Sequence, residues 1–269
     1  MELHSRLRES MSFRPCTLGI AILALAAPVS PSASPSKLPF APGETLTYLL
    51  TWSIFPAGQL VATLSRSGGS SGDPYEIKAT ARSRGFVSHL YEVHDEFQSV
   101  FDPTGICSLR ISKSIQEGRR HKETHIVFDG QRKLAILDES DLTRPGDPPK
   151  HTETETPGCV TDLVTAFYYL RAQPMQVGQQ IVIPVNDGNK TSEVTAQVQA
   201  REEIQTPLGR RFAFRVEPTV FGGLYKRKGR MLIWFSDDPQ RLPLRITAVI
   251  SVGTIVGDLQ SVTQSPVKD

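Results

Sequence analysis

The sequence predicts a mainly β fold, formed by a single curved antiparallel sheet or a barrel-like sheet with one short helix. Apolar and polar side chains alternate through about twelve segments of the 269-residue chain, which is typical of strands that bury one face. Short turns separate several of these segments, as in antiparallel meanders. Residues 161–171 alone carry a convincing helical spacing. A sheet with one apolar face must bury that face, so we expect it to curl or to pack as a sandwich.

Residues 1–34 are expected to be a signal peptide and a Ser/Pro-rich linker. Arg14 precedes an apolar run at residues 18–27, and small residues with Ser and Pro follow. This order of charge, apolar core and small-residue exit is that of a secretion signal. The run is shorter than the roughly 20 residues that span a bilayer, and Cys16 precedes the core, so we expect no lipid attachment. We therefore predict a periplasmic protein whose residues 35–269 form one β-rich domain.

The first half of that domain reads as consecutive strands. In the first, Leu46, Tyr48, Leu50, Trp52 and Ile54 alternate with polar residues, which indicates a strand with these five side chains on its buried face. The strands that follow are predicted at residues 60–64, 75–82, 93–101, 109–115, 122–128 and 134–137.

The second half begins with an irregular stretch and the helix. Residues 138–158 are charged and Pro-rich, and we interpret them as a long exposed loop. Thr161 or Asp162 is expected to cap the helix at 161–171. Further strands are predicted at residues 181–185, 194–200, 212–216, 231–235, 244–250 and 253–262.

Charge and cysteine content narrow the class of protein. The chain has 30 Lys and Arg against 28 Asp and Glu, and loss of residues 1–26 removes three arginines and two glutamates, which leaves a net charge of +1. This balance argues against nucleic-acid binding, which usually requires a basic excess. Cys107 and Cys159 would remain after cleavage. They form either a disulfide, as an oxidising compartment permits, or two separate thiols.

Several segments together resemble a known family. They are residues 46–48, 56–58, 83–86, 90–91, 162–171, 206–209, 233–238 and 241–243. In this order they resemble a bacterial exported family catalogued as domain of unknown function 3108, over residues 42–260. One departure is Cys107-Ser108-Leu109, where a proline is expected after the turn. The resemblance implies an envelope β protein and supplies no catalytic residue, because the family has no accepted activity.

One group of residues has the spacing of a metal site. His121, Glu123 and His125 alternate along one strand and share one face, as ligands of a divalent ion would. Ile126 and Phe128 occupy the other face, so we interpret the three as a solvated outer surface and predict no metal and no cofactor.

A second group suggests acid–base or nucleophilic chemistry. His94, Asp95, Glu96 and Ser99 lie close in sequence. His94 and Asp95 are neighbours on a strand and point to opposite faces, and no Gly-x-Ser-x-Gly elbow or phosphate loop is present. These observations disfavour catalysis, so a hydrolase of envelope glycan or lipid that acts through Asp95, Glu96 or Asp237 is the alternative and not the leading function.

The leading hypothesis is a non-catalytic binding or envelope-maintenance protein that holds an apolar or amphipathic ligand such as a lipid. A third hypothesis is a structural partner of another envelope protein. Aromatic side chains either line a ligand cavity or form plain core; the candidates are Tyr48, Trp52, Phe97, Phe167 and Trp234. A basic cluster either contacts anionic groups or is a solvated hairpin tip; it comprises Lys226, Arg227, Lys228 and Arg230.

Overall fold

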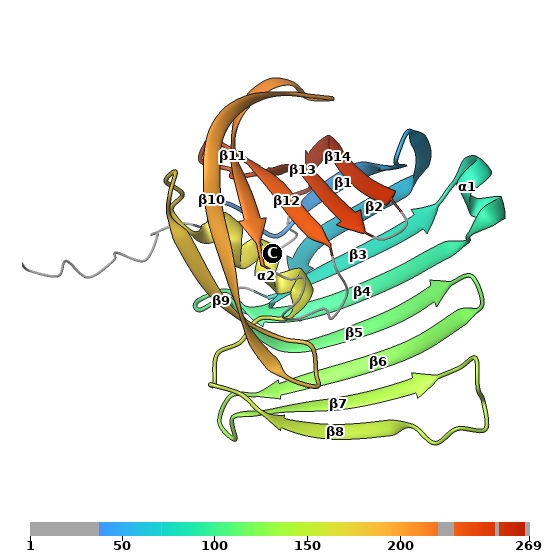
Figure 1. Cartoon of the computed structure of the whole chain (residues 1–269). Coiled ribbons are helices and arrows are strands. Elements are labelled where there is room, and N and C mark those ends of the chain that lie inside the picture. The colour runs from blue at the N-terminus through green and yellow to red at the C-terminus, as the bar shows by residue number, and fades with distance from the viewer. Residues whose placement is uncertain (1–37, 71, 220–228, 251–252, 267–269) are drawn as a thin grey trace, which may run out of the picture. The chain divides into compact units, whose positions relative to one another are not determined.

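The fold is one open antiparallel sheet of fourteen strands that curls around a helix (Figure 1). The computed structural model describes residues 38–70, 72–219, 229–250 and 253–266. The sheet order is β8-β7-β6-β5-β4-β3-β2-β1-β14-β13-β12-β11-β10-β9. The strands are β1 (Glu44–Trp52), β2 (Phe55–Arg66), β3 (Tyr75–Ser83), β4 (Val93–Asp102), β5 (Cys107–Glu117), β6 (Arg120–Asp129), β7 (Leu134–Asp141), β8 (Lys150–Glu155), β9 (Gln180–Asn186), β10 (Thr191–Thr206), β11 (Gly209–Pro218), β12 (Arg230–Ser236), β13 (Pro243–Ile250) and β14 (Gly253–Gln264).

The mainly β, curved antiparallel architecture confirms the predicted fold class. Strand β2 begins at Phe55, five residues before the predicted start, and several other strands extend a few residues beyond their predicted bounds; two further differences are larger. Residues 138–158 are not a loop throughout, because β7 continues to Asp141 and β8 follows as an edge strand. The sequence Lys-His-Thr-Glu-Thr-Glu of β8 suits an edge, where charged residues discourage further pairing. The hairpin of β10 and β11 is also longer than predicted, since its polar residues 201–211 are largely paired.

The predicted helix is α2 (Leu163–Ala172), and Asp162 is its N-cap. A second, shorter helix, α1 (Gly85–Leu90), connects β3 to β4 and has no buried residue. Ile54 also departs from expectation. Ser53 adopts a positive φ of 55° in the β1–β2 turn, and the chain reverses before Ile54 can join the inner face. Its side chain is 80% exposed.

Helix α2 lies on the concave face of the sheet and packs against both halves of it (Figure 1). Leu170, with Phe167 beside it, belongs to a cluster formed with β9–β12. On its other side, Tyr168 packs with Phe101 and Phe40 at ring-centroid distances of 6.1 and 4.9 Å. The helix therefore takes part in two core clusters, one on each side of it, whose apolar burial favours folding.

A buried ion pair fixes the C-terminal end of α2 to β1. Arg171 donates to both carboxylate oxygens of Glu44, at 2.7 and 2.9 Å, and their side chains are 1% and 6% exposed. The guanidinium also lies 5.2 Å from the ring centroids of Phe40 and Tyr168. Breaking one member of such a pair leaves a buried charge without its counterion.

The β9–β10 turn closes over the far end of the same sheet. Gly188 has a φ of +93°, and a Cβ at this position would collide with Leu137 of β7 and Ile126 of β6. Lys150 of β8 donates to Asn189 of this turn. The two ends of the sheet therefore meet through a turn and side chains, although β8 and β9 do not pair with each other.

Candidate ligand-binding face

Strand register identifies which side chains share the concave face with α2. Two transverse rows cross β1–β7 beyond the residues that the helix covers. One row contains Leu46, Ala62, Ala79, Phe97, Lys113, Thr124 and Glu139, and the next contains Tyr48, Leu60, Ala81, Asp95, Ile115, Lys122 and Asp141. Across β1–β4 the rows are mainly apolar, and across β5–β7 they are mainly polar or charged. The two rows together are called the two-row surface.

The apolar part of the two-row surface is only partly covered. Leu60, Ala81 and Phe97 are half-buried, and so is Leu50 at its margin. Leu50 and Leu60 pack against a cluster around Leu46 and Tyr48 that contains no residue of α2. This region therefore offers apolar area that a ligand would cover further.

The charged part contains two lysines in unlike settings. Burial lowers the pKa of Lys113, and the carboxylates of Asp162, Asp187 and Glu139 counteract this only in part. Lys122 Nζ lies 2.8 Å from Glu139 Oε1. Burial raises the pKa of Glu139, but the hydrogen bond and charge of Lys122 outweigh it and hold that pKa below its usual value. A half-buried cation and an ion pair thus lie beside the apolar strip.

Asp95 is the most perturbed carboxyl group of this surface. Burial raises its pKa to about 6, and the negative charge of Glu117 adds to this shift. A hydrogen bond from the Gln116 amide and the charges of Arg120 and His94 act in the opposite direction, but they do not outweigh burial. Asp95 Oδ1 accepts that hydrogen bond at 3.0 Å. His94 instead pairs with Glu96 at 3.0 Å, on the opposite face of the strand, so the sequence neighbours do not form an acid–base pair.

The candidate aromatic residues divide between the two faces. Tyr48 is core, because it is buried and its hydroxyl donates to the Pro243 carbonyl at 2.9 Å; burial raises the pKa of this phenol far above its usual value. Phe97 and Trp52 are half-buried on the concave face. Phe167 packs beneath β9–β12.

Trp234 packs at the edge of the cluster around Leu46 and Tyr48, but from the other face of its own strand. It pairs with Arg245, and Arg245 pairs with Asp258 of β14, so the indole lies on the side opposite Ile233 and α2. Its Nε1 donates to Glu202 at 2.7 Å. From the sequence alone, either face of β12 could be the inner one, and the strand register shows which face it is.

Asp162 organises a buried polar cluster that the sequence did not reveal. Its Oδ1 accepts from the amides of Val164 and Thr165, at 2.8 and 3.1 Å. Its Oδ2 accepts from Ser99 Oγ at 2.6 Å and Ser108 Oγ at 2.7 Å. Ser99, a candidate nucleophile by sequence, is thus bound to the helix cap. The N-cap pattern predicted the backbone contacts but not these two serines from β4 and β5.

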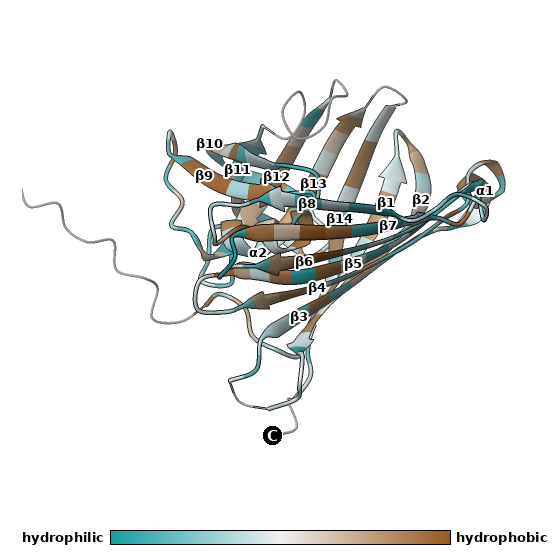
Figure 2. Cartoon of the chain, turned by 90° about the horizontal axis from the view of Figure 1, so that it is seen from below, coloured by the Kyte–Doolittle hydropathy of each residue, from teal (hydrophilic) through white to brown (hydrophobic). Residues whose placement is uncertain are grey.

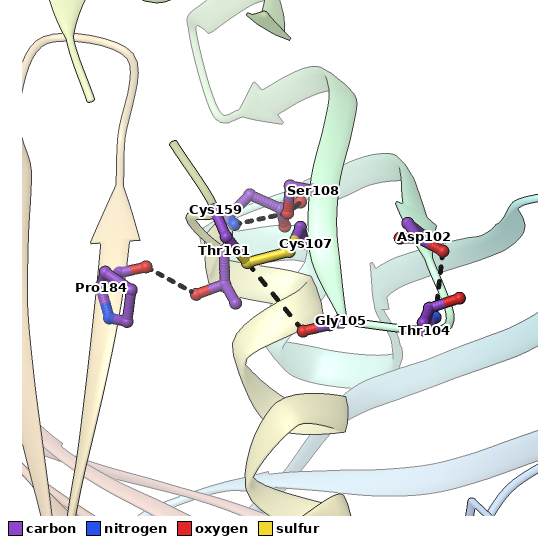
Figure 3. Close-up of a disulfide and its surroundings, with 9 residues drawn as sticks. Asp102, Thr104, Gly105, Cys107, Ser108, Cys159, Thr161 and Pro184 are labelled. Carbon is purple, nitrogen blue, oxygen red and sulfur yellow. Dashed lines mark hydrogen bonds between the residues drawn. A yellow bond between two sulfur atoms is a disulfide. The ribbon is translucent and has the colours of Figure 1, made fainter. Parts of the chain in front are cut away.

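Cys107 and Cys159 form a disulfide beside this cluster, with Cα atoms 5.1 Å apart (Figure 3). The segment after Cys159 joins both halves of the sheet. Ser108 of β5 donates its amide to Val160 at 2.8 Å, and Thr161 donates its amide to Pro184 of β9 at 2.8 Å. The disulfide therefore tethers the start of α2 where β5 and β9 are bridged.

The remaining candidates lie elsewhere. His121, Glu123 and His125 lie on the face opposite Ile126, where His121 pairs with Glu123 at 3.2 Å and His125 hydrogen-bonds to Ser112. Within the described ranges, no cluster of three or more His, Cys, Asp or Glu side chains has metal-site geometry.

The basic cluster is described only in part. Lys226, Arg227 and Lys228 lie outside the described residues. Arg230 makes a two-pronged ion pair with Glu217, with both N–O distances 2.8 Å. Its charge is therefore already partnered within the sheet.

Two hollows lie on the surface of the described residues. A mainly apolar hollow of about 310 Å³ lies between the β1–β2 hairpin and the start of α1, lined in part by Leu49, Pro56 and Arg84. A more polar one of about 360 Å³ lies over β3–β6. No helix among the described residues has the length and apolar character needed to cross a bilayer.

Comparison with known proteins identifies the family and the fold. Residues 47–260 match the family model described as "Protein of unknown function (DUF3108)", which confirms the resemblance seen in the sequence. A β-barrel-like protein of domain of unknown function DUF1849 from Brucella abortus aligns with a TM-score of 0.54 and 9% identity, over 83% of this chain and 98% of its own. A protein with a YmcC-like fold from Bacteroides fragilis aligns with a TM-score of 0.36 and 10% identity, over 84% and 98%. No curated protein matches the chain.

Proposed function

The chain belongs to the DUF3108 family, a family without an assigned function, and we propose that it is a non-catalytic binding protein of the bacterial envelope. In this proposal the two-row surface holds one apolar or amphipathic molecule, such as a lipid. Export to the periplasm is part of the proposal and rests on the secretion-signal pattern of residues 1–34.

The observation that carries the proposal is the division of the two-row surface. Half-buried Leu60 and Phe97 lie on β2 and β4, and Lys113 and Lys122 follow on β5 and β6. An acyl chain against the apolar strip would gain about 25 cal/mol for each Å² of apolar area that it removes from water. An anionic headgroup would then lie beside the lysines, one of which is already poorly hydrated.

The hydrolase alternative receives less support from the same surface. The one side-chain hydrogen bond described for Asp95 comes from a backbone amide. Ser99 is held by Asp162 and Thr165. The Asp162 carboxylate lies within hydrogen-bond reach of Ser99, but both side chains are buried and Asp162 already accepts from Ser108 and two amides, so the pair is not open to a substrate as acyl transfer requires.

Native mass spectrometry of gently purified protein is the test. We expect a co-purifying lipid mass on the wild type, and its loss from Phe97→Asp. Val127→Asp is the matched control, because Val127 is 49% exposed on the opposite face. Circular dichroism confirms that both variants fold.

Three outcomes would contradict the proposal. A bare protein that also fails to bind a fluorescent fatty acid removes its basis. Equal ligand retention by both variants places the ligand elsewhere. Turnover of envelope lipid or glycan by the purified protein supports the hydrolase instead.

A further inference from the structure

Large apolar side chains are exposed together at one end of the sheet. Helix α1 presents Phe86 and Leu90, which are 66% and 61% exposed, and Tyr91 follows at 51%. The β1–β2 turn adds Ile54 at 80% and Phe55 at 50%. These five residues are called the apolar tip.

The two parts of the apolar tip, α1 with Tyr91 and the β1–β2 turn, are neighbours. Helix α1 contacts β2, and the Arg84 amide donates to Ala57 at 2.8 Å. The β5–β6 turn adjoins it, because a Cβ on Gly118 would lie 3.1 Å from the Tyr91 ring. Figures 1 and 2 both show α1 projecting beyond the strand ends, away from α2.

The side chains of α1 in the apolar tip do not belong to the hydrophobic core. No residue of α1 is buried, so its Phe and Leu add little apolar burial to offset the entropy of ordering them. Exposed apolar side chains gathered in this way mark interaction surfaces. They stand on two neighbouring elements, α1 and the β1–β2 turn, which favours insertion of the side chains between loosely packed groups over docking into one rigid socket.

Basic side chains adjoin the apolar tip. Arg84 and Arg119 have no carboxylate within ion-pair distance among the described residues, whereas Arg120 pairs with Glu117 at 3.4 Å. Glu92 is the acidic exception beside α1. Apolar and aromatic side chains bordered by cations match the interface of an anionic bilayer, where acyl chains lie beneath negative headgroups.

We propose that the apolar tip docks this protein on the surface of an anionic lipid bilayer. Phe86, Leu90 and Ile54 enter the acyl boundary, and Arg84 and Arg119 contact lipid phosphates. The inference deepens the proposed function by naming the source of its ligand. Leu50 of the concave face lies on the strand that ends at the tip, so docking brings the binding face next to the membrane.

Co-flotation of the full chain with vesicles tests the proposal. We expect binding to phosphatidylethanolamine vesicles that contain phosphatidylglycerol, and little binding to phosphatidylcholine alone. Phe86→Ser with Leu90→Ser should weaken partitioning by about tenfold or more, because both side chains lose apolar contact with lipid. Val127→Ser with Val182→Ser is the matched control, since these valines are 49% and 51% exposed elsewhere.

A charge variant separates the two contributions. Arg84→Glu with Arg119→Glu should reduce binding to anionic vesicles and remove its dependence on salt. An unchanged melting temperature shows that each variant folds, as expected for residues outside the core.

Several results would overturn the proposal. They are a wild type that does not float, equal flotation of the Phe86/Leu90 variant and its valine control, or photocrosslinking from position 86 in cells to a protein and not to lipid. Binding of the fluorescent fatty acid in solution, measured on the same variants without vesicles, is independent of docking. The Phe86/Leu90 variant should bind it as the wild type does while Phe97→Asp does not, so failure of one proposal is distinguishable from failure of the other.

Discussion

Replacing Asp162 by Ala is expected to destabilise the fold by about 3–5 kcal/mol. The carboxylate caps α2 through two amides and accepts hydrogen bonds from Ser99 and Ser108. Loss of a helix cap costs about 0.5–2 kcal/mol, and each buried donor left without an acceptor adds about 1–3 kcal/mol. Ser99 retains its contact with Thr165, which keeps the total below the simple sum of these losses.

Urea unfolding of the oxidised protein measures this effect. Asp129→Ala is the matched control, because Asp129 accepts from the amides of Gln131 and Arg132 in an exposed turn. Those amides can bond to water after the change, so we expect a loss of about 1 kcal/mol or less. If Asp162→Ala is no more destabilising than Asp129→Ala, the buried cluster does not contribute as argued.

Three further predictions concern other parts of the fold. Folding raises the pKa of Asp95 from 3.8 to about 6. Between these pH values the native state binds more protons than the unfolded state, so stability should fall as the pH rises through this range. Asp95→Asn should abolish this slope in urea unfolding measured at several pH values, and an unchanged slope would contradict the assignment. Cys107→Ser with Cys159→Ser removes a link between residues 52 apart in sequence and should cost up to about 4 kcal/mol, so a variant whose melting temperature matches the wild type would show that the link is dispensable. Arg171→Met leaves Glu44 buried without its partner and should cost about 3–5 kcal/mol; addition of Glu44→Gln should restore part of this in a double-mutant cycle, and a purely additive result would argue against coupling.

Local pattern explains what the sequence predicted and what it could not. The alternation of apolar and polar residues shows that a strand has one apolar and one polar face, and this is enough to predict a curved β fold. It does not identify the inner face of a strand in which both faces carry apolar residues. The face of Trp234, for example, follows only from its pairing with Arg245. Strand β8 lacks an apolar face because it is an edge.

The candidate site was harder to predict, because its contacts join distant segments. Ser99 and Ser108 precede Asp162 by 63 and 54 residues, and no local signal connects them. Helix α1 is six residues long and buries none of them, so it lacks the periodic apolar stripe by which helices are recognised.

The pairing of β1 with β14 has a consequence for the order of folding. Glu44 at the start of β1 pairs with Gln264 near the end of β14, so the middle of the sheet is formed by the first and last strands, while the sequence neighbours β8 and β9 form its ends. A chain that emerges from its N-terminus must leave one edge of β1 unpaired until its final strand arrives. Such contacts of long sequence separation slow folding, and an unpaired edge invites aggregation. A protein truncated before β14 would expose this edge permanently, so we expect it to aggregate more readily than the full chain.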